Sequence, residues 1–256
     1  VFGRHLERSL DDLAREALQG ALKDAGCAVG DLGAAFYSGI TNGTLQGQTA
    51  IPGQVVFSKI GIEGIPVFNV EHACASGSSA FHLAVQYVKA GVCDVALAIG
   101  AEKMNVADKL KAMGVMEGGW DVSRVEENFE ILKKLGDGVV PPPGSESDRP
   151  FSRFMAIYAS LCRHHMKTFG TTQRQIAAVA AKNHQHSVHN PYSQFRKPFT
   201  IDEVLAAPPI SYPLTLPMCS AMSDGAAAAI VCSEEGLQRI GADRARAVRV
   251  AASVVR

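Results

Sequence analysis

The chain has 256 residues, of which 47% are hydrophobic and 20% charged, proportions typical of a globular protein with a sizeable core. Its 25 basic and 25 acidic residues give a formal net charge of zero, so we expect neither a nucleic acid nor a membrane as partner. The longest apolar runs are much shorter than a membrane span, and Arg4 and Arg8 stand where a signal sequence would be apolar. We therefore expect an intracellular protein, cytoplasmic or, if the source is eukaryotic, peroxisomal.

The six cysteines are widely spaced and include neither a C-x-x-C pair nor a clustered Cys/His zinc pattern. They are Cys27, Cys74, Cys93, Cys162, Cys219 and Cys232. This spacing predicts free thiols and no structural metal.

The first predicted element is a helix over residues 10–25. Leucines and alanines recur there at spacings of three and four, which gives the helix one apolar side. Ser9 is the expected N-cap, and Gly26 follows the last turn.

Three short apolar runs follow, at residues 34–40, 65–70 and 94–102, and helical patterns lie between them. Such runs are typical of strands that are buried on both faces. Strands that alternate with helices predict an α/β layered domain with a largely parallel sheet.

From Lys103 to Pro217 this alternation stops. The segment contains glycines, a PPPG turn, a charged helical pattern and several prolines, and a strand pattern resumes at residues 224–232 with DGAAAAIVC. We therefore predict that the middle of the chain is an inserted region.

Cys74 lies between the apolar run that ends at Val70 and a predicted amphipathic helix, SGSSAFHLAVQYVKAG. The apolar face of that helix is Ala80, Phe81, Ala84, Val85 and Val88. A thiol at a helix N-terminus meets backbone N–H groups and the positive end of the dipole, which favour the nucleophilic thiolate.

Other interpretations of Cys74 remain open on these residues alone. Most single cysteines are small buried core residues. A phosphate could bind at the same helix N-terminus, but neither G-x-G-x-x-G nor a G-K-[ST] loop is present. A serine nucleophile elbow would need G-x-S-x-G, which SGSSA lacks.

The motif VEHACASGSSA, followed by KNHQHSVHNPYSQFRKPFT and SDGAAAAIV, resembles the thiolase superfamily, in particular its sterol-carrier-protein-2 and lipid-transfer type. The resemblance implies a thiolase-like layered α/β fold, with a mixed, mostly parallel sheet covered by helices and an inserted loop domain. It assigns residues 1–102 and 218–245 to an N-terminal half-domain and residues 103–217 to the loop domain. Residues 246–256 resemble the start of a second half-domain, which supplies a catalytic histidine and a second cysteine and is otherwise absent here.

The resemblance also implies an activity. In that family, the cysteine at the position of Cys74 takes the acyl group from a CoA thioester, and its own N–H forms part of an oxyanion hole. This implies thiolytic cleavage of a 3-ketoacyl-CoA or the reverse condensation, with coenzyme A as a substrate and no permanently bound cofactor. A thiolase-like retro-aldolase and a non-catalytic acyl-CoA or lipid-binding subunit are the alternatives.

The resemblance extends to CoA-binding residues: Ser220 matches a pantetheine contact, and Phe154 and Met155 match the pocket wall over the sulfur. Each could equally be an ordinary turn or core residue. The eight cations of residues 149–201, a segment with no Asp or Glu, suit the phosphates of CoA, unless they are merely a solvated face. They are Arg149, Arg153, Arg163, Lys167, Arg174, Lys182, Arg196 and Lys197.

The resemblance implies two kinds of protein partner. In thiolases the strand before the cysteine lies at a twofold contact, so VFNVEHA is expected to be buried in a homodimer. Some lipid-transfer members also bind a small OB-fold protein. His72 is expected to be a structural or dimer-contact residue.

Overall fold

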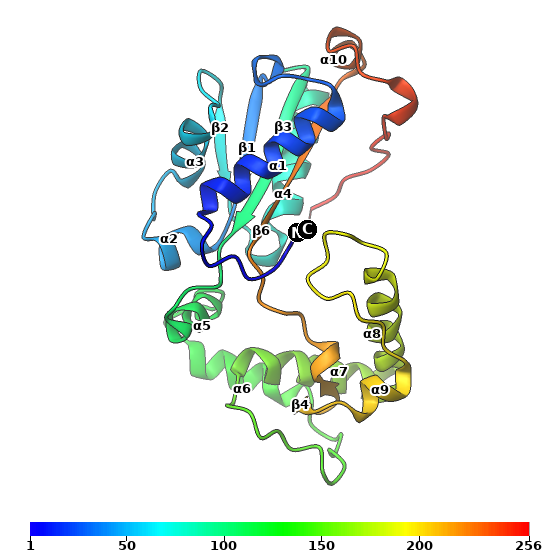
Figure 1. The fold of residues 1–256 in the computed structure, drawn as a ribbon. Helices are drawn as coiled ribbons and strands as arrows, with labels where there is room; N and C mark the ends of the chain where they lie inside the picture. Colours follow the sequence, from blue (N-terminus) through cyan, green and yellow to red (C-terminus); the bar gives the residue numbers. More distant parts are fainter. Residues whose placement is uncertain (256) are drawn as a thin grey trace. The chain divides into compact units, whose positions relative to one another are not determined.

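The computed structural model describes residues 1–255, without the side chains at positions 109, 110 and 113. It contains two compact units (Figure 1). The sheet unit consists of Phe2–Val115 and the segment that begins at Ser223, and the helical unit consists of Met116–Met222 together with Val1. The sequence placed the corresponding boundaries after residues 102 and 217.

The sheet unit contains four strands and most of the N-terminal helices. Its strands are β1 (Ala34–Ser38), β2 (Val67–Val70), β3 (Val95–Glu102) and β6 (Gly225–Cys232). Its helices are α1 (Leu10–Ala25), α2 (Thr41–Gln46), α3 (Pro52–Ile60), α4 (Ser76–Lys89) and α10 (Glu234–Arg239), with 3-10 turns η1 (Val29–Asp31), η2 (Ala73–Ala75) and η4 (Arg244–Arg246). Helix α5 (Lys109–Glu117) contains the point where the chain passes into the helical unit.

The strand order in the sheet is β2-β1-β3-β6. Strand β1 pairs in parallel with both β2 and β3, whereas β6 runs antiparallel to β3, from Glu102 opposite Gly225 to Val95 opposite Cys232. The predicted α/β fold with a mixed, mostly parallel sheet is confirmed. All four predicted strands are present.

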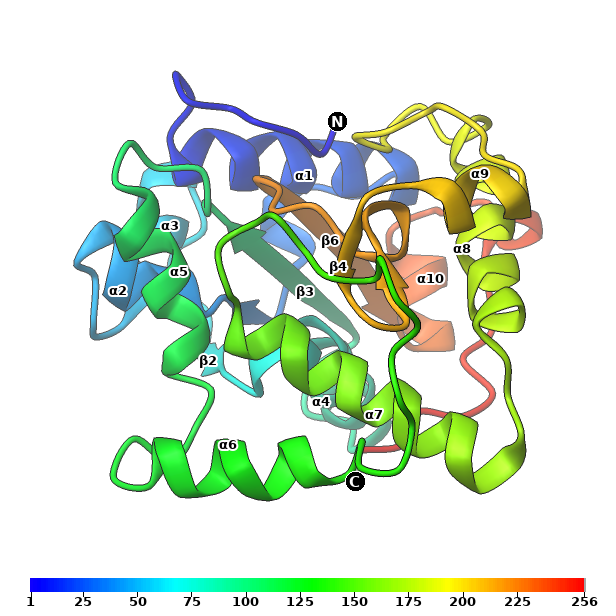
Figure 2. The same ribbon diagram turned by 90° about the horizontal axis from the view of Figure 1, so that it is seen from below.

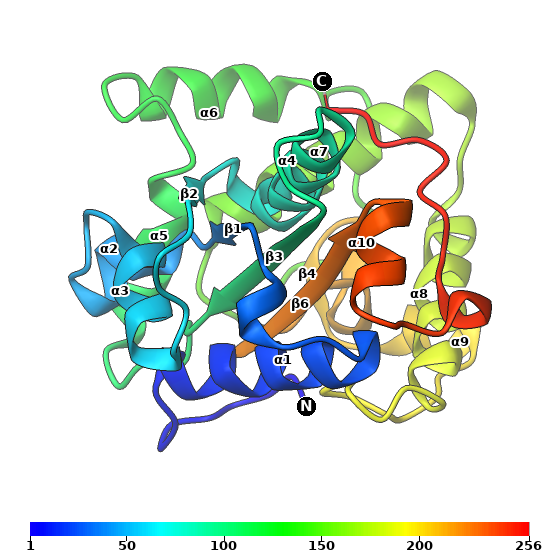
Figure 3. The same ribbon diagram turned by 90° about the horizontal axis from the view of Figure 1, so that it is seen from above.

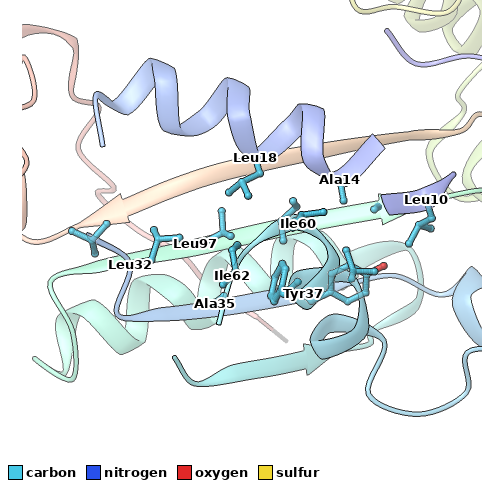
Figure 4. Packing of buried hydrophobic residues seen from close by; sticks show 14 residues of the cluster. Leu10, Ala14, Leu18, Leu32, Ala35, Tyr37, Ile60, Ile62 and Leu97 are labelled. Atoms are coloured by element: carbon cyan, nitrogen blue, oxygen red, sulfur yellow. The ribbon is translucent and has the colours of Figure 1, made fainter. Parts of the chain in front are cut away.

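Helices cover both faces of this sheet, α1 and α3 on one side and α4 on the other (Figure 3). Because side chains alternate along a strand, Ala35 and Tyr37 of β1 face α1 and α3, and Phe36 faces α4. Figure 4 shows the first of these layers, where Leu18 of α1 and Leu97 of β3 lie among the buried apolar side chains. Four of the five residues predicted for the apolar face of α4 are buried, and Phe81 is partly buried.

Helix α1 has the predicted bounds because both ends carry capping residues. The Ser9 side chain accepts a hydrogen bond from the Asp12 amide, and the Asp12 carboxylate accepts one from the Ser9 amide at 3.0 Å. Gly26 ends the helix in the left-handed conformation, at φ 71°. The capping box and the C-terminal glycine thus fix a 16-residue helix whose inner side packs on the sheet.

Strand β2 is less buried than the sequence predicted. Like β6, it lies at an edge of the sheet, and Phe68 is 39% exposed although its ring stacks on Phe36 at a centroid distance of 5.0 Å. An apolar run does not reveal whether its strand is central or at an edge. The expectation of burial on both faces was therefore wrong for β2 within this chain.

A buried charge cluster fixes the start of β6. Asp224 has no exposed surface, and its carboxylate accepts hydrogen bonds from the amides of His5 and Asn105 at 2.9 and 2.7 Å and from Lys103 Nζ at 3.1 Å. Burial opposes ionisation, but these donors prevail and hold the pKa of Asp224 below its ordinary value. The cluster joins the N-terminal segment, the end of β3 and the start of β6.

The helical unit contains four helices, a two-stranded ribbon and a 3-10 turn, which can be followed in Figure 2. The helices are α6 (Val125–Lys134), α7 (Arg153–Phe169), α8 (Gln173–Ser187) and α9 (Ile201–Ala206), the ribbon is β4 (Pro209–Ser211) with β5 (Leu214–Thr215), and the turn is η3 (Leu216–Met218). Ala177 and Ala181 of α8 pack against Val204 of α9 in a small apolar cluster.

The C-terminal residues have no strand partner among the described residues. Residues 247–255 are irregular. Val250 packs on the cluster beside α4, and Ser253 Oγ lies 3.0 Å from His82 Nδ1 of that helix. In the described part of the chain, no helix has the length and apolar character needed to cross a bilayer.

Candidate functional site

Cys74 lies in the 3-10 turn η2, which joins strand β2 to helix α4. The predicted order of a strand, a turn and a helix around this cysteine is therefore present. The residue is exposed, so the interpretation of Cys74 as a small core residue is excluded. A small exposed turn directly before a 14-residue helix leaves the thiol open to a reactant.

Side chains of the neighbouring residues hold this turn in place. Ser76 Oγ accepts a hydrogen bond from the His72 amide at 2.8 Å and donates one to the Ala73 carbonyl at 2.7 Å. The His72 ring is itself fixed, because its Nδ1 lies 2.9 Å from Ser79 Oγ of α4. Of the two roles that the sequence suggested, a structural one is therefore observed, since the His72 ring anchors the turn to the helix.

The backbone amides of this turn differ in their hydrogen bonding within the described part of the chain. The Ala75 amide donates to the His72 carbonyl at 2.9 Å, and the Ser76 amide donates to the Ala73 carbonyl. No acceptor is assigned to the Cys74 amide in the part of the chain that the structure describes. An N–H of this kind, on the same residue as an exposed thiol, is a donor that an oxyanion hole could use.

The other thiols differ from Cys74 in their exposure. All six cysteines are free, and each of the other five is partly buried. Burial is the first cause of a raised pKa in all five: Cys27, Cys93, Cys162, Cys219 and Cys232. A raised pKa lowers the thiolate fraction at neutral pH, so these five are poor nucleophiles.

A pocket of about 330 Å³ lies at the carboxyl ends of β1 and β2. Tyr37 and Asn42 on its wall bond each other, with Asn42 Nδ2 donating to the Tyr37 hydroxyl oxygen at 3.0 Å, and burial raises the pKa of Tyr37. The wall also includes Glu71, three residues before Cys74. The complete lining is Tyr37, Gly39, Ile40, Asn42, Gly43, Gln48, Thr49, Ile51, Pro52, Asn69, Val70 and Glu71. Residue patterns gave no signal for this pocket, because it is formed by several short segments with no shared motif.

The other predicted site residues all belong to the helical unit. Phe154 and Met155 are half-buried in the first turn of α7, where the Phe154 ring contacts the Tyr158 ring at 4.9 Å. Ser220 is exposed in the irregular segment after η3. Their roles in binding CoA stay predictions.

Arg196 and Lys197 are exposed in the irregular segment between α8 and α9. Arg196 Nη2 donates to the Val188 carbonyl at 3.4 Å, and Lys197 Nζ lies 5.1 Å from the centroid of the Phe199 ring. Neither side chain has a carboxylate partner among the described residues. Both cations therefore stay candidates for a phosphate group.

Two of the other predicted cations are already neutralised by acids from outside residues 149–201. Arg153 pairs with Glu126 and, at 3.5 Å, with Glu117. Arg174 pairs with Asp202 at 2.6 Å. The basic surface that the sequence suggested is consequently smaller than a count of charges along that segment implies.

Comparison with known proteins identifies relatives over nearly the whole chain. Residues 2–205 match the family model described as thiolase, N-terminal domain. Sterol carrier protein 2 of Rattus norvegicus is 34% identical over 253 residues, which cover 98% of this chain and 42% of that protein. The benzoylsuccinyl-CoA thiolase subunit BbsB of Thauera aromatica is 34% identical over 257 residues, covering 100% of this chain and 58% of the relative.

The solved structures include a similar fold at lower sequence identity. The chain of an Ltp2-ChsH2(DUF35) aldolase matches with a TM-score of 0.66 and 22% identity, over 93% of this chain and 54% of that one. This likeness shows a shared fold. The chain spans about half the length of the relatives that it matches.

Proposed function

Because this chain belongs to the thiolase family, we propose that the whole protein is an acyl-CoA acyltransferase of the thiolase type and that Cys74 is its nucleophile. The exposed Cys74 in the turn between β2 and α4 is the observation that carries this proposal. The Cys74 amide, which has no acceptor among the described residues, supports the proposal, since the same residue then offers both a nucleophile and an oxyanion donor.

In the proposed reaction, the Cys74 thiolate attacks the 3-keto carbon of a 3-ketoacyl-CoA, and the Cys74 N–H donates to the resulting oxyanion. The bond between the second and third carbons then breaks. Its electron pair goes to the second carbon, which takes up a proton and leaves as acetyl-CoA. The acyl group stays on Cys74 as a thioester until the thiolate of a second CoA attacks it, which releases an acyl-CoA and regenerates the Cys74 thiolate.

The proton transfers in this scheme need an acid and a base. In the proposal, a histidine and a second cysteine of a second half-domain do this work, as the resemblance to thiolases implies. The proposal gives this role to neither of the two histidines nearest to Cys74 in the sequence, because His72 Nδ1 lies 2.9 Å from Ser79 Oγ and His82 Nδ1 lies 3.0 Å from Ser253 Oγ.

Intact-mass measurement of the whole protein after addition of acetyl-CoA tests the nucleophile. We expect wild type to gain one acetyl group, Cys74→Ser to gain none, and the matched control Cys93→Ser to behave as wild type. Acylation of Cys74→Ser to the wild-type extent would contradict the proposal. Iodoacetamide should likewise modify Cys74 first, because the other five thiols are partly buried.

A retro-aldol cleavage of a CoA thioester is the second candidate function. It is supported by the similar solved structure, which is described as an aldolase. Such a cleavage does not need an acyl-cysteine. Turnover of a 3-hydroxyacyl-CoA that survives Cys74→Ser would support this candidate over the first.

The proposal includes a second copy of the chain as a partner. The edge strand β2 has one side without a strand partner among the described residues, and its Phe68 is 39% exposed. Phe68→Asp should therefore convert a homodimer to monomers in sedimentation measurements. Since BbsB is a subunit and the similar structure contains a DUF35 partner, a second protein partner is also part of this proposal.

A further inference from the structure

The residue before Cys74 has an unusual backbone conformation. Ala73 has φ 45°, in the left-handed region that favours glycine. Among the described residues that are not glycine, Ile51 shares this sign of φ. A conformation of this kind costs free energy and persists only where the surroundings hold it.

Side chains on the two sides of Cys74 hold both polar backbone groups of Ala73. The Ala73 N–H donates to Glu71 Oε1 at 2.6 Å, and the Ala73 carbonyl accepts from Ser76 Oγ at 2.7 Å. Ser76 is buried as part of α4, whereas Glu71 is exposed and also borders the pocket beside β1 and β2. The carboxylate therefore has no packing role to explain its position.

We infer that Glu71 is a positioning residue for the Cys74 nucleophile, an inference that rests on the proposed function. By accepting the Ala73 N–H, the carboxylate stabilises the left-handed conformation of Ala73. The next peptide unit carries the Cys74 N–H, so the same bond sets the direction of the oxyanion donor and of the thiol. Without it, Ala73 relaxes to an ordinary conformation and the turn changes its path.

For this role of Glu71, the hydrogen-bond acceptor is essential and the charge is secondary. Glu71→Ala removes the acceptor, and we expect Cys74 acylation by acetyl-CoA to slow about tenfold to a hundredfold, as small displacements of a reacting group do. Glu71→Gln keeps an acceptor oxygen and should restore most of the rate. Glu63→Ala, an exposed carboxylate before β2, is the matched control and should acylate as wild type.

A second variant tests whether backbone conformation is the cause. Glycine adopts the left-handed region without strain, so Ala73→Gly removes the need for the Glu71 bond. We therefore expect Glu71→Ala to cost about tenfold or more in the wild-type background and under about threefold in the Ala73→Gly background, a non-additive pair. A Glu71 that acted only on folding would lower the unfolding temperature equally in both backgrounds.

The measurement is the rate of acylation and of iodoacetamide modification at Cys74, by peptide mass spectrometry on the whole protein. A wild-type rate for Glu71→Ala, an equal loss for Glu71→Gln, or a full loss in the Glu71→Ala/Ala73→Gly pair would each overturn the inference. If wild type is not acylated, the proposed function fails, and the iodoacetamide rates alone then support or overturn the role of Glu71.

Discussion

The sheet unit and the helical unit are stabilised in different ways. In the sheet unit, apolar layers cover both faces of one sheet, and Phe57 and Leu97 have no exposed surface. In the helical unit, the cluster around Val204 has alanines as its other buried members, and exposed ion pairs such as Arg174–Asp202 join its helices. The comparison indicates that the turn with Cys74 belongs to the unit that has the larger buried apolar core.

The two units can be followed separately in solution. The one tryptophan of the chain, Trp120, belongs to the helical unit, so its fluorescence reports unfolding there. Hydrogen exchange measured by mass spectrometry reports the sheet and the helices at the same time. Together, the two measurements separate unfolding of the sheet unit from unfolding of the helical unit.

The largest effect is expected from Phe57→Ala in α3. The side chain is fully buried against Tyr37, with ring centroids 5.8 Å apart, and its removal leaves a cavity. We expect a loss of about 4 kcal/mol in the free energy of unfolding, seen as faster exchange throughout the β1–β3 region. Val92→Ala, at a position that is 58% exposed in the native protein, is the control; equal losses in both variants would contradict the assigned core.

The next effect is expected from Asp224→Asn. The amide leaves the Lys103 cation buried without its counter-charge, which costs about 3 kcal/mol. Because the pKa of Asp224 is lowered in the folded protein, its carboxylate contributes stability above the ordinary value of about 3.9. That contribution is lost as the pH falls through the folded pKa. The stability curves of wild type and of Asp224→Asn should therefore run parallel between about pH 5 and pH 8 and converge in stronger acid.

A smaller effect is expected from Val204→Ala in the helical unit. Removal of two buried methyl groups should lower the free energy of unfolding by about 2 kcal/mol. The unfolding midpoint followed by tryptophan fluorescence should shift to a lower urea concentration, while the rate of hydrogen exchange in the sheet stays unchanged. Val179→Ala, at a position 57% exposed on α8, is the matched control. Faster exchange in β1 and β3 of the Val204→Ala variant would show that the units do not unfold separately.

The smallest effect is expected from Arg174→Ala. Its partner Asp202 is 81% exposed and Arg174 itself is 59% exposed, so the ion pair contributes about 0.5 kcal/mol or less. The difference from wild type should vanish in about 1 M salt, where charges are screened within a few ångströms. A loss above about 2 kcal/mol that survives high salt would contradict this view of the helical unit.

Residue patterns predicted those parts of the fold that depend on local chemistry. Ser9, Asp12 and Gly26 determine helix α1 because each acts on a backbone group within a few residues. The central strands were equally visible, since β1 is a continuous apolar run. The exposure of β2 was not visible, because its position at the edge depends on which strands pair.

The candidate site was predicted in part. The sequence placed Cys74 between a strand and a helix, and the structure adds that the residue is exposed. It could not indicate the left-handed backbone of Ala73, because alanine has no preference for that region. The sequence also overestimated the cationic surface, because Arg153 pairs with Glu126, which lies outside the segment 149–201 in the sequence.

The antiparallel pairing of β3 with β6 allows the segment between these strands to vary in length and structure without disturbing the sheet. Glu102 and Gly225 are direct partners, so the chain leaves and re-enters the sheet at points about 5 Å apart. The residues between them form a single connection between two paired strands. The entropic cost of closing such a connection grows only slowly with its length. Evolution could therefore lengthen, shorten or exchange this connection while keeping the register of the strands that carry the cysteine turn.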